Sequence, residues 1–130
     1  AMVEAGLYDP KRELMVPDPS SIALGGRLLQ RLLQQAPDTD AAFFCNDDLA
    51  QGALFECARQ QISVPAQLAV AGFNDLSASA STVPSLTTIA TPRFDIGVQG
   101  ANMLLSLIEH QKVNRSSIDL GFELKPRESA

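Results

Sequence analysis

The sequence contains no long run of charge of one sign and no basic patch. Its 130 residues include 10 Lys and Arg against 15 Asp and Glu, which gives a net charge of −5 and a pI near 4.7. Because nucleic-acid binding depends on clustered positive charge, this piece is not expected to bind DNA by itself. No apolar run approaches the about 20 residues that a membrane-spanning helix needs. No signal peptide is visible at the N-terminus.

Cysteine and histidine are scarce in the chain. Its two cysteines, Cys45 and Cys57, do not have the spacing of a metal site, and there is no second pair. We therefore expect two buried, reduced thiols in a reducing compartment. The single histidine, His110, lies near a predicted helix C-terminus, where a cation interacts well with the helix dipole. No G-x-S-x-G motif is present, so we predict no catalytic residue, no metal and no cofactor.

Apolar strands alternate with amphipathic helices along the chain, and 45% of the residues are hydrophobic. The predicted strands cover residues 12–18, 40–45, 67–73, 85–91 and 117–127, and the predicted helices cover residues 18–37, 46–61 and 92–111. Asp18 is expected to cap the first helix, because Pro19 follows it. The run "DAAFFC" at 40–45 is continuously apolar, as in a strand buried on both faces. This alternation predicts a three-layer αβα fold with a mainly parallel sheet.

Polar side chains follow two of these strands at the point where each strand ends. Asn46, Asp47 and Asp48 follow "FFC", and Asn74 and Asp75 follow "AGF". Ligands of parallel α/β sheets bind beyond the carboxyl ends of the strands, so both groups can line one crevice. Helix capping explains the two neighbouring aspartates more simply than a general acid/base pair or a magnesium site does. For the two asparagines, capping and the recognition of ligand hydroxyls are equally consistent with the sequence.

The predicted helix 46–61 has an apolar stripe that covers about half of its circumference, wider than the about 100° that one packed face requires. This width suggests a second partner for the helix, such as another subunit. The two glycines of "LGGRLL" (24–29) lack the lysine and the spacing of a phosphate-binding loop. They are expected to permit close helix packing instead.

Four segments together resemble the effector-binding domain of LacI/GalR-family transcriptional regulators: "NDDLAQGAL", "VPAQLAVAGFND", "PSLTTI" and the helix that starts with "PR". "MVPDPSSIALGG" and "FFCNDDLAQGALFEC" look most like the gluconate-utilisation repressors of that family. The resemblance implies an incomplete periplasmic-binding-protein-like lobe. Residues 1–88 would form the C-terminal lobe. Residues 89–130 would supply a crossover segment, a helix and a strand to the other, mostly missing lobe. The apolar face of the helix at 92–111 would then be exposed or covered by another chain.

The same resemblance assigns five residues to effector binding, namely Asn46, Asn74, Arg93, Thr91 and Ser20. Three of these positions depart from the family pattern. Asn74 stands where an aspartate is common, Ser20 where several relatives have an aromatic ring, and Thr91 where glutamine is frequent. Such a pocket fits a small, hydroxyl-rich, anionic ligand such as gluconate. Arg93 would pair with the carboxylate of that ligand, or else serve only as a structural residue at the crossover.

The family resemblance also implies a homodimer, formed through the helix at 48–61 and the loop at 76–84. The predicted interface residues are Ala50, Gln51, Leu54, Phe55, Ser77 and Ala80. Operator DNA would be contacted only through an N-terminal headpiece that this chain does not contain. No membrane partner is expected.

The sequence therefore favours the effector-sensing and dimerisation domain of a cytoplasmic transcriptional repressor, and not an enzyme. One alternative is a periplasmic sugar-binding protein of a transporter, which shares the fold. A second alternative is a small α/β hydrolase or a magnesium phosphatase, in which Asp47 would take part in catalysis.

Overall fold

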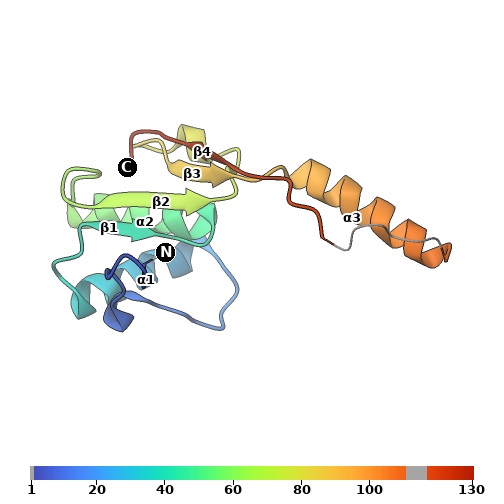
Figure 1. Cartoon of the computed structure of the whole chain (residues 1–130). Coiled ribbons are helices and arrows are strands. Elements are labelled where there is room, and N and C mark those ends of the chain that lie inside the picture. The colour runs from blue at the N-terminus through green and yellow to red at the C-terminus, as the bar shows by residue number, and fades with distance from the viewer. Residues whose placement is uncertain (1, 111–116) are drawn as a thin grey trace.

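The computed structural model describes residues 2–110 and 117–130, and within them the strands form one four-stranded sheet in the order β1-β2-β3-β4. β1 pairs in parallel with β2, β2 pairs in parallel with β3, and β4 runs antiparallel to β3 (Figure 1). The strands are β1 (Ala41–Phe43), β2 (Ala69–Phe73), β3 (Thr87–Ala90) and β4 (Glu123–Lys125). The predicted α/β class with a mainly parallel sheet is confirmed.

The helices among the described residues are α1 (Ile22–Gln35), α2 (Asp47–Gln60) and α3 (Arg93–Ile108), with short 3-10 turns η1 (Pro10–Arg12) and η2 (Ser79–Ser81). The cap of α1 is Ser21, whose hydroxyl accepts a hydrogen bond of 3.1 Å from the Leu24 amide, so the prediction of Asp18 was wrong. The predicted strand at 12–18 was also wrong, because that segment is irregular after η1. Residue 111, the predicted end of the last helix, lies outside the described residues.

Helices α1 and α2 cross closely because glycines lie at their contact. A Cβ atom on Gly25 would overlap the Leu49 carbonyl of α2, and one on Gly52 would overlap the Ile22 carbonyl of α1. The glycines of "LGGRLL" therefore permit close packing, as predicted. Because α1 packs against α2 and α2 packs against β2, most of the wide apolar stripe of α2 is buried within the chain, and Phe55 at its border is 51% exposed. A second subunit is not needed to explain its width, which corrects that part of the sequence analysis.

The sheet is buried on one face and open on the other at its β1 edge. Ala42 and Phe44 face the core formed with the two helices, where they are joined by Leu24, Leu29, Leu49, Ala53, Leu54, Cys57, Leu68, Val70 and Leu86. The intervening Phe43 is 60% exposed. The expectation that the 40–45 strand is buried on both faces was therefore wrong for this chain.

Helix α3 extends away from the sheet, as Figure 1 shows, and none of its residues is buried. Its exposed apolar residues are Phe94, Ile96, Val98, Leu104, Leu105, Leu107 and Ile108. The assignment of this helix to another lobe stays a prediction. Among the described residues, no helix has both the length and the apolar character needed to cross a membrane.

The end of the chain returns to the same sheet, which corrects the assignment of the last strand to the other lobe. β4 pairs with β3, with Ile89 opposite Leu124. Ser129 is fully buried, and its hydroxyl donates a hydrogen bond of 2.6 Å to the Val70 carbonyl of β2. The predicted boundary between 88 and 89 also falls inside β3.

Close helix packing predicts that alanine at Gly25 or Gly52 will destabilise the 130-residue chain. Overpacking a tight contact costs about 1–3 kcal/mol or more of unfolding free energy. The matched controls are Gly97→Ala and Gly100→Ala in α3, where a Cβ atom would meet nothing within 4 Å. Those changes should stabilise the helix by up to about 1 kcal/mol, because alanine is the better helix former. Urea unfolding followed by circular dichroism measures the unfolding free energy of each variant. Equal effects of alanine at Gly25 or Gly52 and at the α3 positions would contradict the close packing of α1 on α2.

Candidate functional site

The candidate site lies at the carboxyl edge of the three parallel strands, the edge from which α3 departs (Figure 1). Asn46 follows β1, Asn74 follows β2, and Thr91 and Arg93 follow β3. Pairing continues past the end of β2, since the Asn74 amide donates a hydrogen bond of 2.8 Å to the Ile89 carbonyl. The strand register therefore brings these predicted residues to one edge of the sheet.

Asn46 is both a helix cap and a contact of Ser20. Its Oδ1 accepts a hydrogen bond of 3.0 Å from the Leu49 amide and caps α2. Its Nδ2 donates a hydrogen bond of 2.7 Å to the Ser20 hydroxyl, on the segment that precedes α1. The side-chain oxygen of Asn46 thus caps α2, while its NH2 group binds Ser20, a second predicted site residue. Capping and site formation, which the sequence left as alternatives, coexist in this side chain.

Asn74 and Asp75 form a turn with left-handed backbone conformation. Their φ angles are 105° and 49°, values that asparagine and aspartate adopt more readily than most other residues. Within the described ranges, the half-buried Asn74 side chain makes no hydrogen bond. An amide can donate two hydrogen bonds and accept two. Its full capacity is therefore available to a ligand at the strand edge.

Arg93 is the first residue of α3 and an exposed cation at this edge. Its backbone amide donates to the Thr91 carbonyl at 2.7 Å, and its Nη2 lies 3.5 Å from the Asp75 carbonyl oxygen. That long contact leaves most of the guanidinium donors free. The start of a helix also carries a partial positive charge, which favours an anion near this side chain.

Asp47 connects the elements that carry the site. Its side chain is fully buried, and its Oδ2 accepts hydrogen bonds of 2.7 Å from both the Leu76 amide and the Ser79 hydroxyl. Its Oδ1 accepts a third bond of 2.6 Å from the Thr88 hydroxyl of β3. The expectation that Asp47 caps its helix was wrong, because Asn46 does so. A carboxylate that is sequestered and satisfied in this way is structural, which also argues against a catalytic Asp47.

The sequence did not predict the ion pair between Asp75 and Arg127. Arg127 Nη2 donates to Asp75 Oδ1 at 2.7 Å, and Arg127 Nη1 donates to the Leu86 carbonyl at 2.7 Å. The two partners of the ion pair are 52 residues apart, and only the return of the C-terminal segment to the sheet joins them. No local sequence pattern indicates such a contact.

The two cysteines differ in their surroundings. Cys57 is buried, and this burial raises the pKa of its thiol to about 11, with the neighbouring Glu56 carboxylate adding to the effect. Cys45 is exposed beside Asn46, so the expectation of two buried thiols was wrong for this residue. Across residues 2–110 and 117–130, no group of three His, Cys, Asp or Glu side chains could hold a metal ion.

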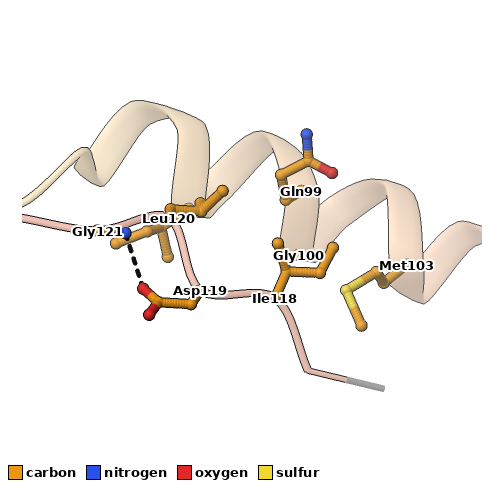
Figure 2. Close-up of a pocket in the computed structure, with 8 residues that line it drawn as sticks. Gln99, Gly100, Met103, Ile118, Asp119, Leu120 and Gly121 are labelled. Atoms are coloured by element: carbon orange, nitrogen blue, oxygen red, sulfur yellow. Dashed lines mark hydrogen bonds between the residues drawn. The ribbon is translucent and has the colours of Figure 1, made fainter. Parts of the chain in front are cut away.

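A groove of about 400 Å³ lies between α3 and residues 118–121 (Figure 2). Its lining is mainly apolar, with Ile96, Met103, Ile118 and Leu120 prominent among its side chains. The carboxylate of Asp119 accepts a hydrogen bond of 2.8 Å from the Gly121 amide. None of the predicted effector residues lines this groove.

The predicted dimer residues divide into two sets. Ala50, Gln51 and Leu54 are 0%, 6% and 3% exposed, so they lie in the core of this chain and expose little surface to a partner. Their assignment to a dimer interface stays a prediction. Phe55 is 51% exposed, and Ser77 and Ala80 in the following loop are also exposed.

The fold agrees with the protein family that the chain matches. The family model of the periplasmic binding protein-like domain matches residues 1–130, and the chain belongs to that family. The resemblance to LacI/GalR-family regulators, and to gluconate repressors among them, is likewise confirmed by its relatives.

Three curated regulators and two solved structures illustrate this similarity. The chain is 54% identical over 129 residues to the HTH-type transcriptional regulator GntR of Pseudomonas aeruginosa, covering 99% of this chain and 38% of that protein. It is 44% identical over 105 residues to IdnR, and 39% identical over 126 residues to GntR, both of Escherichia coli K12, covering 81% and 97% of this chain and 32% and 38% of those proteins.

Among solved structures, the transcription regulator GntR from Chromobacterium violaceum is 48% identical, with a TM-score of 0.89 over 98% of this chain and 47% of that one. The regulator CelR in complex with cellobiose is 27% identical, with a TM-score of 0.88 over 99% of this chain and 39% of that one. The chain therefore spans less than half the length of the relatives it matches.

Removal of the Asp47 carboxylate should destabilise the fold strongly. In Asp47→Ala, a half-buried amide and two buried hydroxyls lose their acceptor, and we expect a loss of about 3 kcal/mol or more in unfolding free energy. The neighbouring Asp48→Ala change is the matched control. It removes only a favourable charge in the first turn of α2, worth up to about 1 kcal/mol. Chemical denaturation distinguishes the two; similar losses would contradict the structural role of Asp47.

The cysteines should react at very different rates. At pH 8 the buried Cys57 thiol remains protonated, because its pKa of about 11 lies well above that pH. A disulfide reagent such as Ellman's reagent should therefore modify Cys45 rapidly and Cys57 only after unfolding. Cys45→Ser should abolish the fast phase. If both thiols of the native protein react equally fast, Cys57 is not buried as described.

Proposed function

We propose that the chain is the effector-sensing segment of a transcriptional repressor whose effector is a sugar or sugar acid, such as gluconate. The observation that carries the proposal is the strand edge itself. Asn74, with an unpaired amide, and Arg93, with an exposed guanidinium, lie there beside the Asn46–Ser20 pair. The names of the GntR relatives and the cellobiose complex of CelR support a ligand of this class.

The proposed chemistry assigns separate roles to the charged and the neutral side chains. Arg93 binds the carboxylate of the effector with charge-assisted hydrogen bonds. Asn46, Asn74, Thr91 and Ser20 bind its hydroxyls, since amides and hydroxyls both donate and accept. The neutral amide of Asn74 leaves this position without a charge that would repel an acid. An acidic effector therefore suits the edge better than a neutral sugar does.

Effector binding acts on DNA through a shift of population in the whole regulator. The effector favours one arrangement of the two lobes only to the extent that it binds that arrangement more tightly. The headpiece that contacts operator DNA lies outside this chain. The relatives described above are transcriptional regulators, and we propose that this chain likewise is no enzyme and that it acts in the cytoplasm.

Dimerisation through α2 and the loop at 76–84 remains part of the proposal. Direct contact with a partner is open to the exposed residues Phe55, Ser77 and Ala80. The other three predicted residues are buried and can only support that surface from within the chain, namely Ala50, Gln51 and Leu54. Partner packing on Phe55 would bury a large apolar side chain that the single chain leaves half exposed.

Calorimetric titration of the full-length regulator with gluconate tests the effector. Arg93→Ala should weaken binding by about 1.5 kcal/mol or more, the scale of a hydrogen bond to a charged group. Arg59→Ala is the matched control, because Arg59 is an exposed arginine in the last turn of α2, at the opposite end from Asn46. Unchanged affinity in Arg93→Ala would refute the role of Arg93. A wild-type protein that binds no sugar acid would refute the proposed effector.

A further inference from the structure

The turn that presents Asn74 is conformationally demanding. Two consecutive residues other than glycine, Asn74 and Asp75, have positive φ angles of 105° and 49°. Such conformations persist where the surroundings determine them, and they cluster at ligand-binding positions. The contacts that hold this turn therefore decide where the Asn74 amide points.

Contacts from several separate elements converge on the turn. The Leu76 amide donates to Asp47 of α2 at 2.7 Å, and the Asp75 amide lies 3.4 Å from the Thr88 hydroxyl of β3. An ion pair comes from the end of the chain, where Arg127 donates to Asp75 Oδ1 at 2.7 Å. The carbonyl of Asp75 in turn lies 3.5 Å from the Arg93 guanidinium. Asp75 thus connects Arg127 with two of the proposed effector residues.

Arg127 is itself held in place by its surroundings. Its side chain is 19% exposed, its Nη1 donates to the Leu86 carbonyl at 2.7 Å, and its backbone amide donates to Thr87 Oγ1 at 2.8 Å. Its neighbour Ser129 is fully buried against β2 and β3. A guanidinium that the Leu86 carbonyl already holds loses little entropy when it binds a carboxylate, and lysine lacks the planar group that can make both contacts.

We infer that Arg127 is a positioning residue of the effector site, which acts through Asp75 on the Asn74 turn. It fixes the left-handed turn, and it neutralises the one carboxylate that lies next to Asn74 in the chain. Without Arg127, the Asp75 carboxylate is free to turn toward the ligand and repels an anion. The inference rests on the proposed function, because it concerns the same effector site. In it, the C-terminal segment makes the strand edge suitable for an acidic ligand.

Gluconate titration of the full-length regulator tests this role by rescue. Arg127→Gln should weaken binding about tenfold or more, since it removes a charge-assisted contact and leaves a carboxylate unpaired. Arg127→Lys keeps the charge but cannot contact Asp75 and the Leu86 carbonyl at once. Its gluconate affinity should lie between those of the wild type and Arg127→Gln. In the Arg127→Gln, Asp75→Asn double variant no carboxylate is left unpaired, and affinity should return to within about threefold of Asp75→Asn alone. A merely structural role predicts no such rescue.

The matched control is Arg12→Gln. Arg12 forms a 2.7 Å ion pair with Asp38, which precedes the amino end of β1, at the opposite edge of the sheet. The Arg12→Gln change should leave gluconate affinity unchanged. Hydrogen exchange of peptides that contain residues 74–76 gives a second measurement that needs no ligand, and Arg127→Gln should accelerate it while Arg12→Gln should not.

The outcomes separate the inference from the proposed function. If the wild-type protein binds gluconate and Arg127→Gln changes neither affinity nor exchange, the inference is wrong and the proposed function stands. The absence of rescue in the double variant also overturns it. If the wild-type protein binds no sugar acid but exchange at the turn is accelerated in Arg127→Gln, the control of the turn by Arg127 is supported and only the proposed effector is wrong.

Discussion

A single buried carboxylate, that of Asp47, holds together the elements on which the candidate site depends. It lies at the start of α2 and accepts hydrogen bonds from the turn after β2, from η2 and from β3. Gly72 lies so close to it that a Cβ atom there would overlap its Oδ1. Buried polar groups with every bond satisfied specify one arrangement, because any other arrangement leaves them unpaired. The positions of Asn46, Asn74 and Arg93 follow from this arrangement.

Much of the fold was predictable from local pattern. The apolar runs gave the three parallel strands, helical periodicity gave all three helices to within a few residues, and polar residues at the strand ends marked the edge where the site lies. These features arise from neighbours in the chain, which a sequence displays directly. The motif resemblance added the family, which the relatives confirm, and an assignment of five residues to effector binding, which stays a prediction.

The errors arise where distant parts of the chain decide the structure. Cys45 and Phe43 are exposed because none of the described residues covers that side of β1, and a periodic pattern cannot show which faces are covered. The wide apolar stripe of α2 needs no second subunit, because α1 packs on α2 through glycines. Arg127 reaches Asp75 only because the C-terminal segment returns to the sheet. Each outcome depends on contacts between residues far apart in sequence.

We propose above all that the carboxyl edge of the sheet binds an acidic, hydroxyl-rich effector. A crystal structure of the full-length regulator with gluconate is the most direct test. We expect the ligand carboxylate within hydrogen-bond distance of Arg93 and its hydroxyls on Asn46 and Asn74, with Asp75 still paired to Arg127. Gluconate bound elsewhere, or bound with Arg93 and Asn74 turned away from it, would refute this proposal.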